Sequence, residues 1–133
     1  MTYISGETNK LIFANKILKY KNNKKSKTYD DGASIESYGN KFRFRFEIEN
    51  NIEALEFLKT HLDYIESITM VFRLYHRYNT IILKYLYNSY GKKFKLLYPG
   101  GDFSEDQVFA SFDSIDEVIA ELHKLFEQNK GKI

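Results

Sequence analysis

The sequence contains no cysteine and no tryptophan, and it has only one proline among its 133 residues. Without cysteine the chain forms no disulfide, no thiolate metal site and no thiol nucleophile, as is typical of proteins in a reducing compartment. No hydrophobic run approaches the ~20 residues that a membrane-spanning helix needs. The N-terminus also lacks a basic stretch followed by an apolar run, so no signal peptide is expected. These absences predict a soluble, cytoplasmic protein that does not associate with membranes.

Sequence motifs of the common enzyme and cofactor classes are missing as well. Gly100-Gly101 is not followed by Gly-Lys-Ser/Thr, so it is not a phosphate-binding loop, and no H-E-x-x-H, G-x-S-x-G or dinucleotide fingerprint occurs. Asp102, Glu105 and Asp106 lie close together but lack the spacing of a calcium-binding loop. We therefore expect no cofactor and no metal, and the absence of these motifs argues against an enzyme.

Charge is almost balanced overall but unevenly distributed along the chain. The formal net charge is +2, yet residues 10–27 hold seven lysines and no acid, and residues 99–123 hold seven acids and no lysine or arginine. Such asymmetry either steers charged partners or lets the two regions attract each other. The acidic 102–121 region, with Asp102, Glu105 and Asp106, is accordingly one candidate binding surface.

Hydrophobic residues are plentiful, at 43% of the sequence, and include 11 Phe and 11 Tyr. A chain of this length and composition can bury a core of its own, so we expect a single domain over residues 1–133. The polar segments 21–32 and 129–133 are expected to be flexible, because they offer little apolar surface to bury.

The clearest strand signal lies between residues 42 and 49. Apolar and charged residues alternate without a break, so Phe42, Phe44, Phe46 and Ile48 face one side, and Arg43, Arg45, Glu47 and Glu49 face the other. This pattern predicts a half-buried strand with a polar outer face. Gly39-Asn40 is a plausible hairpin turn from a preceding strand at 35–38.

The remaining pattern predicts an α+β fold, namely a mainly antiparallel sheet of four to five strands with two to three helices on one face. Helices are expected at 52–65, capped by Asn50 or Asn51, and at 115–128, where Ser114 and Glu117 form a capping box. Further strands are expected at 68–77, 81–87 and 93–98, with a short edge strand at 108–112. Residues 9–20 fit either a helix or a strand. The predicted core is centred on Phe42, Phe44, Phe46, Ile48, Leu55, Leu58, Leu62, Phe72, Leu74, Phe94, Leu96, Val118, Ile119, Leu122 and Phe126.

All four arginines occupy alternating positions of two predicted strands. Arg73, Tyr75 and Arg77 share one face of the second strand, as Arg43 and Arg45 share one face of the first. If these two outer faces coincide, they form an arginine and tyrosine surface of the kind that is enriched in binding hot spots. This surface is the second candidate binding site.

The favoured hypothesis is a non-enzymatic macromolecule-binding protein, most specifically a small inhibitor of a cognate protein of the toxin-immunity or anti-defence type. The alternative is nucleic-acid or nucleotide binding through the same face, with the arginines and Lys95 contacting phosphate and Tyr75 stacking on a base. A third hypothesis is a small phosphodiester-cleaving enzyme that uses His76. The partner is thus expected to be a protein, with nucleic acid as the alternative.

Overall fold

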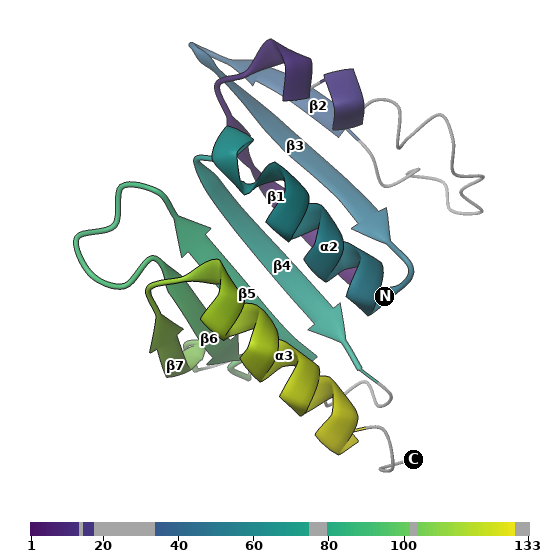
Figure 1. The fold of residues 1–133 in the computed structure, drawn as a ribbon. Coiled ribbons are helices and arrows are strands. Elements are labelled where there is room, and N and C mark those ends of the chain that lie inside the picture. The colour runs from purple at the N-terminus through teal and green to yellow at the C-terminus, as the bar shows by residue number, and fades with distance from the viewer. Residues whose placement is uncertain (14, 18–33, 75–79, 102–103, 130–133) are drawn as a thin grey trace.

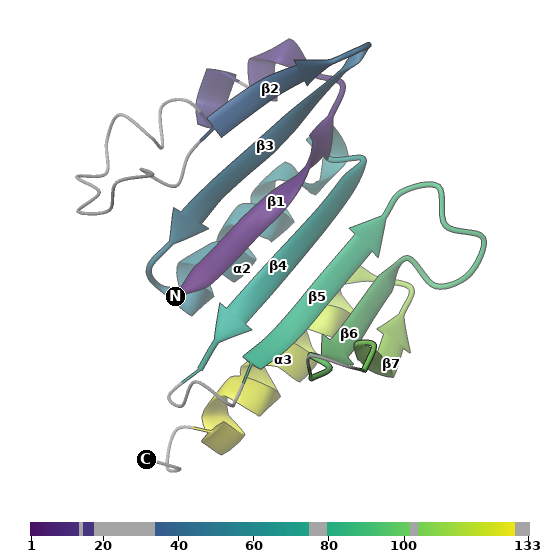
Figure 2. The ribbon, with the colours of Figure 1, turned by 180° about the vertical axis from the view of Figure 1, so that it is seen from behind.

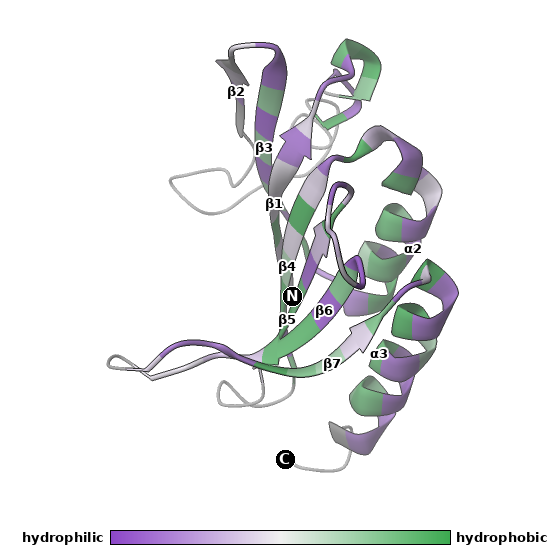
Figure 3. Cartoon of the chain, turned by 90° about the vertical axis from the view of Figure 1, so that its left-hand side faces the viewer, coloured by the Kyte–Doolittle hydropathy of each residue, from purple (hydrophilic) through white to green (hydrophobic). Residues whose placement is uncertain are grey.

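The computed structural model describes residues 1–13, 15–17, 34–74, 80–101 and 104–129 of the chain. They form an antiparallel sheet in the order β2-β3-β1-β4-β5-β6-β7, with helices on one of its two faces (Figures 1 and 3). The predicted α+β class is confirmed, although the sheet has more strands than the four to five expected. The strands are β1 (Thr2–Thr8), β2 (Ser34–Tyr38), β3 (Lys41–Ile48), β4 (Ser67–Arg73), β5 (Thr80–Leu86), β6 (Phe94–Tyr98) and β7 (Gln107–Phe112).

The strand that the sequence pattern did not reveal is β1, which occupies the middle of the sheet between β3 and β4. Its helix-facing positions are Thr2, Ile4, Gly6 and Thr8, so only one of the four is a large apolar residue. Both threonines are nevertheless fully buried, because Thr2 donates a hydrogen bond to Asn51 and Thr8 donates one to the carbonyl of Tyr64. Two hydrogen-bonded threonines and a glycine thus replace the apolar residues whose alternation would indicate a half-buried strand.

Gly6 allows β1 to lie close to its neighbours. A Cβ atom at this position would come within 2.3 Å of the Ser67 carbonyl oxygen and 2.7 Å of the Phe44 ring. Phe44 thus fills the space over the helix side of β1 that a side chain at position 6 would otherwise occupy. A glycine in the interior of a strand is typical where another group approaches the backbone this closely.

The connection between β3 and β4 explains why β1 is central. Both strands are antiparallel to β1, so they are parallel to each other and require a crossover. Helix α2 (Asn51–His61), followed by the 3₁₀ turn η1 (Leu62–Tyr64), provides that crossover on one face of the sheet. The Asn50 side chain accepts hydrogen bonds from the backbone N–H groups of Ile52 (2.8 Å) and Glu53 (3.2 Å), which confirms the predicted cap.

The last helix, α3 (Ile115–Asn129), follows β7 and covers the other half of the same face (Figure 1). Ser114 accepts a hydrogen bond from the Glu117 backbone at 3.2 Å, as the capping-box pattern predicts. At the other edge of the sheet, Gly39 has a φ of +59°, so the predicted tight turn between β2 and β3 is also confirmed.

The segment that fitted either a helix or a strand is helical where it is described, at residues 11–13 and 15–17. Phe13 and Ile17 from this N-terminal helical segment are buried at helical spacing. The Phe13 ring lies 5.4 Å from that of Phe44 and 5.9 Å from that of Phe57, measured between ring centroids. The segment therefore extends the helical layer over β3.

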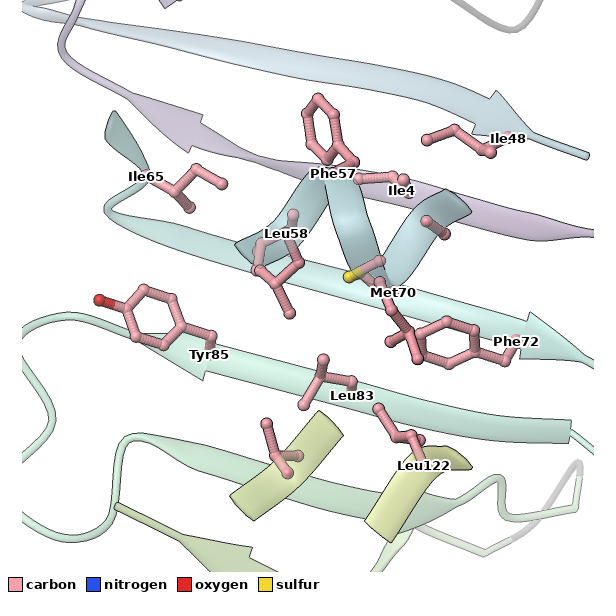
Figure 4. Packing of buried hydrophobic residues seen from close by; sticks show 14 of the residues in the cluster. Ile4, Ile48, Phe57, Leu58, Ile65, Met70, Phe72, Leu83, Tyr85 and Leu122 are labelled. Atoms are coloured by element: carbon pink, nitrogen blue, oxygen red, sulfur yellow. The ribbon is translucent and has the colours of Figure 1, made fainter. Parts of the chain in front are cut away.

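The core lies between the helices and the sheet (Figure 4). Ten of the fifteen predicted core residues are buried, whereas Phe42, Leu62, Leu74, Ile119 and Phe126 are only partly buried. Ile4, Phe57, Met70 and Leu83 complete the centre of the core between β1, β4, β5 and α2. Within the described part of the chain, no helix is long and apolar enough to cross a membrane.

Two predicted features fall on residues that the structure does not describe. The predicted strand 68–77 corresponds to β4, which ends at Arg73, and positions 75–79 lie outside the described residues. The same holds for nearly all of the two segments expected to be flexible, 21–32 and 129–133.

Candidate functional site

The face of the sheet opposite the helices is open in the described part of the chain (Figure 2). Its strands direct six cationic side chains and three carboxylates to this side. By contrast, α2, η1 and α3 carry seven carboxylates and two lysines on the opposite side. The strands of the open face therefore carry a net positive charge and helices α2 and α3 a net negative one, so the strand surface is the one suited to an anionic group. The six cations are Lys41, Arg43, Arg45, Arg73, Lys84 and Lys95, and the three carboxylates are Glu7, Glu36 and Glu47.

The structure brings three of the four arginines onto the open face. Arg43 and Arg45 lie on β3 and Arg73 lies at the end of β4, with β1 between these strands. Arg73 is stacked against the ring of Tyr3 on β1, with its guanidinium carbon 4.9 Å from the ring centroid. The outer faces of the two arginine-bearing strands therefore coincide, as the sequence hypothesis required.

Glu7 on β1 is the acidic partner of the cations at one end of this face. Its carboxylate lies 3.4 Å from Arg43 Nε and 3.8 Å from Lys41 Nζ. Lys41 is also 2.9 Å from Glu66, and this hydrogen bond, together with the charges of Glu66 and Glu7, raises the pKa of the Lys41 ammonium group. Arg43 is thus paired with Glu7 across the β3–β1 ladder.

A shallow polar hollow of about 370 Å³ lies over this end of the open face. Two arginines, two glutamates and the hydroxyl groups of two serines and a threonine surround it. This set of groups suits a polar or charged side chain of a partner, because cations, anions and neutral donors are all within one small depression. The hollow is lined by Ser5, Gly6, Glu7, Glu36, Arg43, Phe44, Arg45, Ser67 and Thr69.

A second feature of the open face is a row of cations that crosses the strands. The register aligns Arg45 of β3, Lys84 of β5 and Lys95 of β6 in one row, which we call the basic row. On β1, β4 and β7 the row passes through Ser5, Thr69 and Ser111. Among the described residues, none of the three cations has a carboxylate oxygen within 4.0 Å. With strands ~4.8 Å apart, the row is about 20–25 Å long.

Lys84 and Lys95 are direct cross-strand partners in the basic row, and both are exposed. Like charges placed directly opposite each other in an antiparallel ladder destabilise the sheet. This arrangement therefore costs the isolated fold some stability, and an anionic group bound between the two ammonium groups would offset that cost.

Beside the basic row lies an apolar row, which consists of Tyr3, Val71, Ile82, Leu97 and Val108. It crosses the same open face two residues away from the basic row along β1, β4, β5 and β6. Ile82 and Leu97 at its centre are nearly buried, at 8% and 6% exposure, whereas Val108 on the edge strand β7 is 51% exposed. A line of aliphatic side chains bordered by cations is the kind of surface that protein interfaces use.

The acidic 102–121 region does not form one surface. Glu105 and Asp106 lie in the connection between β6 and β7, which projects from the open side of the sheet (Figure 3). Asp116, Glu117 and Glu121 belong to α3 on the opposite side. Asp106 also has a structural role, since its carboxylate accepts a hydrogen bond from the Gly100 backbone N–H at 2.8 Å.

Four residues singled out from the sequence lie outside the described residues, namely Tyr75, His76, Arg77 and Asp102. Of the other two histidines, His61 forms a 2.9 Å hydrogen-bond contact through Nδ1 with the Phe57 carbonyl and packs against the rings of Phe57 and Phe13. His61 is thus engaged in packing within the helical layer. Among described residues, no group of three or more histidine and acidic side chains is arranged to hold a metal ion.

Comparison of the chain with protein-family models, with curated proteins and with solved structures gives no match. The open face therefore has to be interpreted from its own chemistry. Sequence patterns pointed to Arg43, Arg45, Arg73 and Lys95, but not to Glu7 or Lys84. Glu7 lies on the unrecognised strand β1, and only the β5–β6 register places Lys84 opposite Lys95.

Proposed function

We propose that this protein binds an acidic surface of another protein through the open face of its sheet. The observation that carries the proposal is the juxtaposition of Lys84 and Lys95 within the basic row, where neither has a carboxylate partner among the described residues. An arrangement that weakens the isolated fold is explained if a partner supplies the missing anions. The biological role that we propose is inhibition of a cognate protein, of the toxin-immunity or anti-defence type.

Two features of the open face favour a protein over nucleic acid. Glu7, Glu36 and Glu47 lie among the cations on β1, β2 and β3, where they would repel a phosphate backbone. Single-stranded nucleic acid also requires rings on which bases stack. Tyr3 is the one aromatic residue among the described side chains that the strands place on the open face. Its ring is already in contact with Arg73.

The separation of charge between the two faces supports an inhibitory role. An inhibitor has to reach its target rapidly, and complementary charge accelerates association through long-range steering. The acidic helices α2 and α3 would at the same time disfavour approach of an acidic partner from the wrong side. Val108, the exposed end of the apolar row, would then add an apolar contact, and the basic row would provide part of the charged border.

The test compares two double charge reversals of equal size. Lys84→Glu with Lys95→Glu alters the basic row, and Lys59→Glu with Lys124→Glu alters the helical layer. A protein captured by the wild type from nuclease-treated lysate of the source organism is purified, and its affinity for all three forms is measured by calorimetry. We expect the first pair to weaken binding ~10-fold or more and the second pair to leave it nearly unchanged. Equal effects of both pairs would exclude the basic row as the contact surface.

The nucleic-acid alternative is measured in parallel with 20-nucleotide oligo-uridine and oligo-thymidine over a salt series. A nucleic-acid-binding face would bind these oligonucleotides tightly, and the Lys84/Lys95 reversal would make the dependence of log K on log salt shallower by ~0.7 for each lost phosphate contact. That result, together with capture of no specific protein, would overturn the proposal in favour of nucleic-acid binding.

A further inference from the structure

The connection between β5 and β6, residues 87–93, carries the most exposed aromatic residue of the described chain. Tyr90 has a relative exposure of 109%, and it is accompanied by Leu86 at 50% and Tyr87 at 58%. The connection lies at one end of the sheet, away from the centre of the open face (Figures 1 and 2). Three large exposed apolar or aromatic residues close together in the sequence indicate a candidate contact surface.

Backbone hydrogen bonds hold this connection in a defined shape. The Leu86 N–H donates to the Lys93 carbonyl at 3.2 Å, and the Tyr87 N–H donates to the Glu66 carbonyl at 2.8 Å. Nearer the tip, the Ser89 N–H donates to the Leu86 carbonyl at 3.2 Å, and the Gly91 N–H donates to the Ser89 hydroxyl at 3.3 Å. These bonds preorganise the connection, so binding through it would sacrifice little conformational entropy.

The side chains of the connection divide into a supporting pair and a free ring. The Lys93 ammonium lies 4.8 Å from the centroid of the Tyr87 ring, so the two side chains brace each other. The Tyr90 side chain is fully exposed to solvent. Tyrosine loses few rotamers on binding and buries 150–250 Å² of surface, and these properties explain its frequency among interface hot spots.

We infer that Tyr90 inserts into an apolar pocket on the protein partner, whose rim is acidic where Lys92 and Lys93 approach it. The partner is taken to be a protein because this inference rests on the proposed function. A nucleic-acid strand is less suited to the connection, since one free ring does not provide the succession of stacking platforms that a strand requires. The β5–β6 connection would thus be the anchor, and the basic row would set the orientation of the complex.

Site-specific photo-cross-linking tests the inference even while the partner is unidentified. The photoreactive residue p-benzoylphenylalanine replaces Tyr90, Lys84 or Ala120 in three separate forms, which are expressed in the source organism and irradiated. Ala120 is a residue of α3 on the acidic side and serves as the control. We expect the forms labelled at 90 and 84 to give an adduct with the same protein, and the form labelled at 120 to give none.

Three other cross-linking outcomes are decisive. An adduct at 84 without one at 90 overturns the insertion of Tyr90 and leaves the proposed function standing. Adducts at all three sites show non-specific contact, and an adduct at 90 that nuclease destroys assigns the connection to nucleic acid; both overturn the inference.

With the cross-linked protein purified, Tyr90→Ala should weaken affinity about 30-fold or more, whereas Tyr90→Phe and the loop control Asn88→Ala should stay within about 3-fold of wild type. Equal affinities of Tyr90→Ala and wild type would also overturn it.

Discussion

Lys84 and Lys95 face each other directly across the β5–β6 ladder, on the side of the sheet that no described helix covers. Neither has a carboxylate within 4.0 Å among the described residues. This pair can be tested by stability as well as by binding, because two like charges placed opposite each other should destabilise the free protein.

Lys95→Glu should stabilise the free protein. The new carboxylate would pair with Lys84 across the strands, so the free energy of unfolding in low salt should rise by ~0.2–1 kcal/mol. Urea denaturation at 20 mM and 500 mM salt measures the effect, which added salt should reduce by screening. Lys92→Glu, an exposed substitution in the β5–β6 connection, is the control. A variant that is less stable than wild type in low salt would show that the pair is not repulsive.

Gly6→Ala should destabilise the fold, because its Cβ would lie 2.3 Å from a backbone oxygen of β4 that no side-chain rotation can move away. We expect a loss of ~1–3 kcal/mol, the usual cost of overpacking. Gly91→Ala is the matched control, since a Cβ at position 91 meets nothing within 4 Å. If both variants unfold at the same urea concentration, the close approach of β1 and β4 at Gly6 is wrong.

Sequence patterns predicted the strands and helices whose buried positions are apolar. They did not reveal β1, whose helix-facing positions are mostly threonine and glycine. Strand β3 has Phe44, Phe46 and Ile48 on its buried side, as the alternation predicted. On β1, threonine and glycine take the corresponding positions, and their burial depends on partners such as Asn51 that are far away in sequence. A local pattern contains no information about such partners.

The candidate site was also predicted only in part. The alternation of β3 placed Arg43 and Arg45 on the outer face correctly, but their neighbours depend on strand order. Because β1 was not recognised, the pairing of Arg43 with Glu7 was not foreseen. The opposition of Lys84 and Lys95 requires the register of two strands, which sequence periodicity does not determine when the connection has seven residues.

Leu122→Ala should strongly destabilise the fold, because Leu122 is fully buried between α3 and the sheet (Figure 4). The cavity and the lost transfer free energy should together cost ~2–5 kcal/mol, measured by urea or thermal unfolding. Leu11→Ala removes the same group from a side chain that is 58% exposed, and it should cost much less. A Leu122→Ala variant as stable as wild type would contradict the packing of α3.

Tyr85 should make stability fall at alkaline pH. Its side chain is 6% exposed and packs against the Phe94 ring with centroids 4.8 Å apart, and burial raises the pKa of its hydroxyl above the usual value. Above pH ~10 the unfolded chain releases this proton while the folded chain retains it, so unfolding becomes more favourable as pH rises. Below pH ~9 both states are protonated and the contribution vanishes.

Tyr85→Phe removes this proton and keeps the ring, so it isolates the effect. The variant should lose less unfolding free energy than wild type between about pH 9 and pH 11, as urea denaturation at the two values would show. The raised pKa of Lys41 also lowers stability as the pH increases, because its ion pairs are lost when the ammonium group deprotonates. That contribution is present in both proteins and cancels from their difference. If the two proteins lose equal stability over this range, the hydroxyl of Tyr85 is hydrated in the folded state and burial does not raise its pKa as described.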